Sequence, residues 1–145
     1  MEKIKVLFVC VHNSARSQMA MAYLKSLGAE EYVADSAGLE PGSLNSMVVK
    51  AMADDGIDIS QNKPKKVFDL IRAGREFDTV VTVCDGVNGE KCPIFPGKVT
   101  RIHKEFTDPS SFSGTDEEVY AKTISVRNEI KEWVKKFIAN GGNYR

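Results

Sequence analysis

The feature that most constrains this chain is a cysteine that follows a strand-like run and precedes an arginine by six positions. The run Ile4–Val9 is almost entirely apolar, which is typical of a parallel strand buried on both faces. Cys10 follows it directly, and the spacing of apolar residues predicts an amphipathic helix over Ser17–Leu27. The residues between Cys10 and Arg16 therefore form a short loop from strand to helix. This arrangement indicates an α/β fold with the loop at the carboxyl end of a strand.

Such a loop can bind a tetrahedral oxyanion. Its backbone N–H groups and the helix N-terminus converge on one point and favour negative charge there; the loop residues concerned are His12, Asn13, Ser14 and Ala15. Arg16 can add two parallel hydrogen bonds to the anion. The same positive field favours the thiolate form of Cys10, which makes it a nucleophile, and Ser17 can donate a hydrogen bond to the sulfur. The alternative is that Cys10 is only a buried strand residue.

The rest of the chain alternates strands with helices. Further strands are expected at 31–37, 79–83 and 98–102, and further helices at 45–55, 64–73 and from Thr115 to the Gly141-Gly142 pair. The alternation predicts βαβ units. We therefore expect one three-layer domain over residues 1–145, with a four-stranded parallel sheet covered by helices on both faces.

Two more chemically capable residues follow expected strands. Cys84 comes at the end of the third strand, and Asp108-Pro109 follows the fourth. Because ligands bind at the carboxyl ends of parallel strands, these residues and Cys10 should open on one edge of the sheet. Asp108, stiffened by Pro109, can donate a proton to a leaving oxygen; the alternative is an ordinary turn. His12 is expected to shape the loop instead of acting as a base.

The two later cysteines leave two reactions open. Hydrolysis of a phosphate ester needs only Cys10, Arg16 and Asp108. If Cys10 instead attacks an arsenic oxyanion, Cys84 can attack the adduct's sulfur and expel reduced arsenic. Cys92 can then attack Cys84 and carry the disulfide outward to an external reductant. The alternative is that Cys84 and Cys92 are incidental.

Composition narrows the class of protein. Twenty basic and twenty acidic residues give no net charge, so neither nucleic acid nor a membrane surface is an expected partner. The sequence has no apolar run long enough to span a membrane and no signal-peptide pattern at its start, so a cytosolic protein is expected. The odd count of three cysteines argues against a disulfide framework. His12 and His103 do not complete a convincing zinc site with them, so no metal is expected.

The stretch Val6–Ala20 resembles the thioredoxin-coupled arsenate reductases, which share the fold of the low-molecular-weight protein tyrosine phosphatases. Further matching segments are Asp35–Gly38, Val83–Asp85, Cys92-Pro93 and Asp108-Pro109. The resemblance implies that Cys10 is the nucleophile, that Arg16 and Ser17 hold the oxyanion and the thiolate, and that Asp108 donates the proton. It also implies a disulfide relay through Cys84 and Cys92, thioredoxin as reductant, and Asn13 and Ser36 as supports of the loop.

The sequence departs from this family in three places. Seven residues separate Cys84 and Cys92, slightly more than expected. Met21 stands where some members carry a glutamate that helps to bind potassium, so that ion is doubtful here. Ser110-Ser111 follows Pro109 in place of the tyrosines that line a phosphotyrosine pocket. Arsenate reduction is therefore the leading hypothesis, with a phosphatase as the alternative and a non-catalytic oxyanion-binding or thiol-sensing module as the third.

Overall fold

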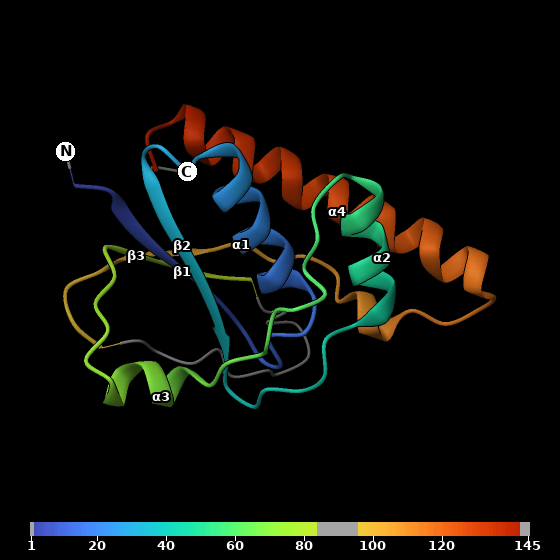
Figure 1. Ribbon diagram of the computed structural model, residues 1–145, viewed down its shortest axis with the longest axis horizontal. Helices are drawn as coiled ribbons and strands as arrows, with labels where there is room; N and C mark the ends of the chain where they lie inside the picture. The colour runs from blue at the N-terminus through green and yellow to red at the C-terminus, as the bar shows by residue number, and fades with distance from the viewer. Residues whose placement is uncertain (1, 84–95, 143–145) are drawn as a thin grey trace.

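A parallel sheet lies at the centre of the molecule (Figure 1). The structure is a computed structural model, and it describes residues 2–83 and 96–142. Within these ranges the sheet has four strands, all parallel, which lie side by side in the order β2 (Tyr32–Gly38), β1 (Ile4–Cys10), β3 (Thr79–Thr82) and β4 (Thr100–His103). The predicted four-stranded parallel sheet is confirmed.

The central strand is the most apolar one, as burial on both faces requires. The residues from Val6 to Val9 are all 0% exposed. The continuous apolar run therefore reflects burial of this strand on both faces of the sheet. Cys10 pairs with Gly38 at the end of β2, and Thr82 pairs with His103 at the end of β4. The carboxyl ends of the strands therefore lie along one edge of the sheet.

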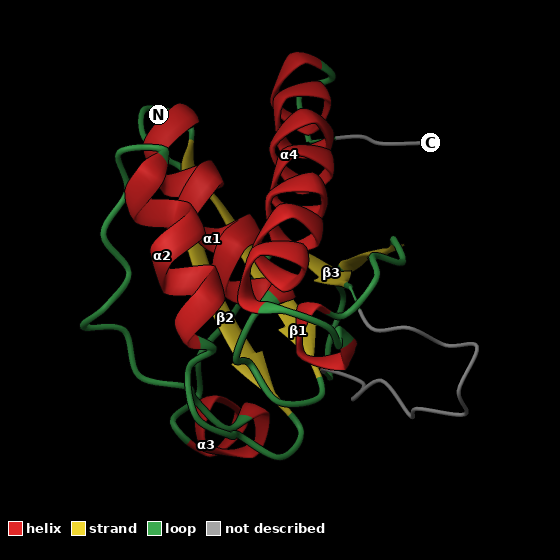
Figure 2. Ribbon diagram, turned by 90° about the vertical axis from the view of Figure 1, so that its right-hand side faces the viewer, coloured by secondary structure: helices red, strands yellow, loops and turns green. Residues whose placement is uncertain are grey.

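Helices cover both faces of the sheet, but unequally (Figure 2). One face packs against α1 (Arg16–Leu27), α2 (Ser46–Asp54) and α4 (Asp116–Ala139), and the other against the short helix α3 (Val67–Arg72). The capping box of Thr115 and Glu118 opens α4 as predicted. On its buried side, Trp133 and Phe137 stack with ring centroids 5.3 Å apart.

Two details differ from the sequence-based expectation. The helix predicted over 64–73 is confined to Val67–Arg72, because Lys66 keeps an extended backbone as its N-cap. The apolar spacing predicts that Leu27 lies on the buried face of the first helix. In the structure Leu27 is 44% exposed, because it is the last residue of α1. Across residues 2–83 and 96–142, no helix is both long and apolar enough to cross a membrane.

A buried aspartate ties α3's flanking segments to the sheet. Asp35 lies on β2 and its side chain is 9% exposed; it accepts from Lys65 Nζ at 2.6 Å and from Arg75 Nη2 at 3.1 Å. Burial by itself raises the pKa of Asp35. The hydrogen bonds from Lys65 and from the Ser36 N–H, with the charge of Lys65 and the hydrogen bond from Arg75, outweigh burial and hold this pKa below its ordinary value.

Asp35→Asn is expected to lower the free energy of unfolding at neutral pH by about 2 kcal/mol, because two cations then lose a buried carboxylate. Since folding lowers the pKa of Asp35, its contribution is fully present above the unfolded value of about 3.9. It disappears as the pH falls through the folded-state value. Urea unfolding of both proteins between about pH 7 and pH 2 should show their difference shrinking in acid.

Asp69→Asn is the matched control. Asp69 also pairs with an arginine, Arg72, but both side chains are more than half exposed. Its loss should cost less than about 0.5 kcal/mol at any pH. Equal effects of the two substitutions, or an Asp35→Asn effect that persists unchanged in acid, would contradict the stabilising role of the buried charge.

Candidate active site

The loop from β1 to α1 is held in an unusual backbone conformation. Strand β1 ends at Cys10 and helix α1 begins at Arg16, with Ala15 as its N-cap. Asn13 has a φ of 52°, in the left-handed region that asparagine tolerates better than most side chains do. This turn aims the Asn13 N–H at the Cys10 sulfur, 3.1 Å away. The loop therefore curls around the sulfur at the positive end of α1.

The Cys10 sulfur makes two hydrogen bonds. One comes from the Asn13 N–H, and the other partner is Ser17 Oγ at 2.9 Å. The Ser17 oxygen also accepts from Asn13 Nδ2 at 2.7 Å, and its own hydroxyl hydrogen can point at the sulfur. The side chain is buried, with Cys10 2% exposed. The sulfur therefore lies in a buried position between two hydrogen-bonding groups, at the N-terminal end of α1.

Arg16 connects this loop to the segment after β4. The residue is 2% exposed, and its Nη1 donates to the carbonyl oxygen of Phe106 at 3.4 Å. Its Nη2 lies 3.5 Å from Asp108 Oδ2. The structure thus brings Cys10, Arg16 and Asp108 to the same edge of the sheet, although Asp108 is far from the other two in sequence.

Asp108 is held from its own loop. It is the N-cap of a short 3₁₀ helix over Pro109–Ser111, and its Oδ1 accepts the Ser110 N–H at 3.0 Å. Ser111 Oγ donates to the Asp108 carbonyl oxygen at 2.6 Å. The side chain remains 26% exposed. The oxygen that faces Arg16 is consequently Oδ2.

The other predicted loop residues lie around this centre with different contacts. His12 is exposed and its Nδ1 lies 2.9 Å from the Glu40 carbonyl oxygen, so it points away from Cys10 and ties the loop to the following segment. The Ser14 carbonyl accepts the Asn45 N–H at 3.0 Å. Ala15 is buried. Cys84 and Cys92, the predicted relay, lie outside the described residues, as do all the residues between them.

The structure places the predicted supporting residue Ser36 against α1. Its Oγ donates to Met21 Sδ at 3.3 Å. Asn13 Oδ1 is also engaged, since it accepts the Lys65 N–H at 2.9 Å and Gln18 Nε2 at 3.2 Å.

These contacts do not fit a potassium ion. A hard cation needs several oxygen ligands with free lone pairs, and Met21 supplies a thioether in place of a carboxylate. Asn13 Oδ1 already accepts two hydrogen bonds from protein groups, and the Ser36 hydroxyl is directed at the Met21 sulfur. Among the described residues, no group of three or more His, Cys, Asp or Glu side chains could hold a metal.

Several supporting residues were missed by sequence reasoning. Gln18 is a polar residue with 1% exposure that bridges Asn13 to Asn62, whose Nδ2 donates to Gln18 Oε1 at 3.1 Å. Gly38 is required by space, because a Cβ there would lie 2.6 Å from the Val11 carbonyl oxygen. A glutamine in the first turn of the predicted helix was a signal that sequence reasoning could have used. The contact from Lys65 to Asn13 is made by a backbone N–H, so no residue type in the sequence marks it.

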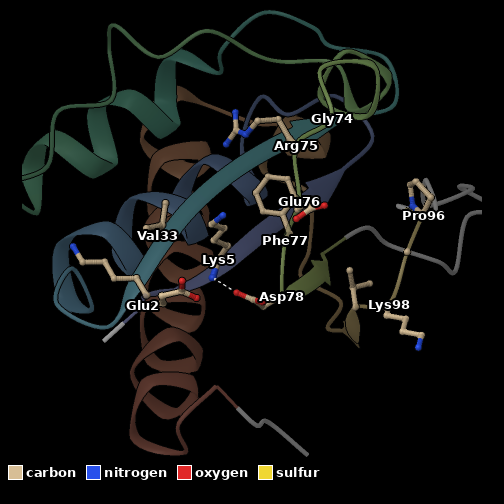
Figure 3. Close-up of a pocket in the computed structure, with 13 residues that line it drawn as sticks. Glu2, Lys5, Val33, Gly74, Arg75, Glu76, Phe77, Asp78, Pro96 and Lys98 are labelled. Carbon is tan, nitrogen blue, oxygen red and sulfur yellow. Dashed lines mark hydrogen bonds between the residues drawn. The ribbon is translucent and has the colours of Figure 1, made fainter.

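A hollow of about 900 Å³ opens at the opposite end of the sheet (Figure 3). It is lined near the starts of the strands by charged residues of both signs, Lys5, Arg75, Asp78 and Lys98 among them. In Figure 3 the backbone N–H of Lys5 donates to the Asp78 carboxylate, 2.8 Å away. This hollow lies far from the carboxyl edge of the sheet, which is the edge at which parallel sheets bind their ligands.

Comparison with known proteins identifies the family. The model of the family described as low molecular weight phosphotyrosine protein phosphatase matches residues 5–140. The chain belongs to this family. An arsenate reductase of Bacillus licheniformis is 41% identical over 143 residues, which cover 97% of this chain and 99% of that protein. The resemblance seen in the stretch Val6–Ala20 is confirmed.

Solved structures of family members agree with this assignment. A structure titled as an arsenate reductase in the phosphate binding state has a TM-score of 0.74 and 33% identity, covering 94% of this chain and 98% of that one. A thioredoxin-dependent arsenate reductase of Corynebacterium glutamicum has a TM-score of 0.60 and 29% identity, covering 92% of this chain and 62% of that one.

Proposed function

We propose that this protein reduces arsenate to arsenite with electrons from thioredoxin, in the cytoplasm. The observation that carries the proposal is the buried Cys10 sulfur with its two hydrogen-bond donors, beside the buried Arg16 at the start of α1. This arrangement binds a tetrahedral oxyanion and presents a nucleophile to its central atom. The similarity to arsenate reductases and the presence of Cys84 and Cys92 favour the reductase over other family activities.

In the first step the Cys10 thiolate attacks arsenic and an oxygen leaves as water. Arg16 and the loop amides hold the charged oxygens and stabilise the transition state. The leaving oxygen takes its proton from Asp108, whose Oδ2 faces Arg16.

In the second step the Cys84 thiolate attacks the Cys10 sulfur. The sulfur–arsenic bond breaks and its electron pair stays on arsenic, so arsenic(V) becomes arsenic(III) and a Cys10–Cys84 disulfide forms. Cys92 then attacks Cys84 and releases the Cys10 thiolate, which leaves a Cys84–Cys92 disulfide. The dithiol of thioredoxin reduces this disulfide and is itself oxidised. None of these steps needs a resident cofactor.

The alternative is hydrolysis of phosphate esters, which the family description and the same Cys10, Arg16 and Asp108 set support. The wild-type protein should couple arsenate to oxidation of thioredoxin in the presence of NADPH and thioredoxin reductase. An aryl phosphate should be hydrolysed slowly at most, since the loop supports attack on phosphorus but Ser110-Ser111 offers no aromatic pocket. Rapid hydrolysis without any arsenate-dependent oxidation would reverse the assignment.

A further inference from the structure

One asparagine contacts both loops that carry the proposed catalytic groups. Asn45 precedes α2 and is its N-cap. Its backbone N–H donates to the carbonyl oxygen of Ser14, in the loop around Cys10, at 3.0 Å. Its side-chain Nδ2 donates to Ser110 Oγ, in the Asp108 loop, at 3.0 Å. A single residue therefore links the nucleophile's loop to the proton donor's loop.

The orientation of this asparagine is determined by a third contact. Asn45 Oδ1 accepts the Val48 N–H at 3.1 Å, which caps α2. With the oxygen committed to the helix, the amide nitrogen must face Ser110. The helix itself is anchored, because Val48 and Met52 are 0% exposed in the core shared with α1 and α4. The link is thus built on a rigid element.

Ser110 transmits this position to the proton donor. Its N–H holds Asp108 Oδ1 at 3.0 Å, and the other carboxylate oxygen is left to face Arg16. The 3₁₀ helix that contains Ser110 is only three residues long; Pro109 is buried, and Ser110 and Ser111 are exposed. Such a short turn has little internal stiffness. Pro109 anchors its start, and the hydrogen bond from Asn45 fixes its exposed side, where the Ser110 N–H holds the carboxyl group.

We propose that Asn45 and Ser110 are positioning residues that set the proton donor Asp108 against the Cys10 loop. The inference rests on the proposed function, in which Asp108 protonates the leaving oxygen. Misplacing a catalytic group by about 1 Å can cost up to roughly 100-fold in rate. The contact therefore acts on the chemical step and leaves capture of the oxyanion to Arg16 and the loop amides.

The test begins with Ser110→Ala, which removes the acceptor of the asparagine amide and keeps the N–H on Asp108. We expect kcat for arsenate to fall roughly tenfold with KM changed less than about twofold. Ser110→Thr, which keeps the hydroxyl, should restore most of the rate. Asn45→Ser keeps a good N-cap but is too short to reach Ser110, so it should show the same loss. Ser113→Ala, in an exposed serine of the same loop, is the control.

A double-variant cycle separates positioning from a general structural effect. If Ser110 acts through Asp108, adding Ser110→Ala to Asp108→Asn should cause no further loss. An additive loss, a change confined to KM, or wild-type kcat in Ser110→Ala and Asn45→Ser would overturn the inference. If Asp108→Asn itself has no effect on arsenate or aryl phosphate turnover, the proposed role of Asp108 fails first, and the inference falls with it.

Discussion

Cys10→Ser is expected to abolish arsenate turnover while leaving the fold and the oxyanion site in place. Serine matches cysteine in shape, so the contacts of the buried site with Asn13 and Ser17 can persist. A hydroxyl, however, ionises far less readily than a thiol, and the histidine of this loop is bonded elsewhere. His12 is exposed, and its Nδ1 lies beside the Glu40 carbonyl oxygen. Loss of a nucleophile typically costs about 10⁴-fold or more in kcat.

Binding and chemistry can be measured separately in this variant. Phosphate should still raise the Tm of Cys10→Ser, because Arg16 and the loop amides supply the binding energy. Cys84→Ser is the matched control, since it also removes one thiol but leaves the first attack intact. A Cys10→Ser protein that reduces arsenate at the wild-type rate would refute the proposed role of Cys10 as the nucleophile. A variant that loses phosphate binding together with activity would show that the sulfur belongs to the binding site itself.

Cys84→Ser and Cys92→Ser should each stop repeated turnover with thioredoxin, by at least roughly 100-fold in kcat. The two substitutions should stop turnover at different steps of the relay. Without Cys84 no thiol attacks the Cys10 adduct, so arsenite is not released. Without Cys92 the first disulfide forms and stays between Cys10 and Cys84, so one arsenite is released per protein molecule and then turnover ends.

Mass mapping of the disulfides after one round of arsenate distinguishes these states. The wild type should carry a Cys84–Cys92 bond, Cys92→Ser a Cys10–Cys84 bond, and Cys84→Ser neither. Any hydrolysis of an aryl phosphate should survive in both variants, because it needs only Cys10, Arg16 and Asp108. Full thioredoxin-coupled turnover in either variant would eliminate the relay.

Local patterns predicted the elements whose cause is local. The apolar run at Ile4–Val9 predicted a strand buried on both faces, and Thr115 with Glu118 predicted the start of α4 from a reciprocal cap. The helix predicted for α3 was too long. Lys66 has an extended backbone and pairs with Gly38 of β2 in an isolated bridge. This pairing is a tertiary contact, so the local sequence pattern could not predict it.

The loop from Cys10 to Arg16 likewise has some features that the local sequence predicts and others that only tertiary contacts decide. Spacing alone predicted an oxyanion cradle, since strand, loop and helix follow one another along the chain. Spacing could not predict that Ser36 bonds to Met21, or that Gly38 must lack a Cβ to let the loop pass. Those contacts join residues that are adjacent only after the strands have paired.

The sequence by itself thus determined the parallel α/β class, and it predicted the nucleophile with its arginine and the two distant cysteines proposed to distinguish reduction from hydrolysis. Each of these depends on residue type and on spacing within one segment or on residue count. Only the tertiary structure decided that Asp108 faces Arg16 and that Asn45 spans the two loops. The physical reason is that a hydrogen bond between distant segments depends on the packing of whole helices against the sheet, which no short window of sequence contains.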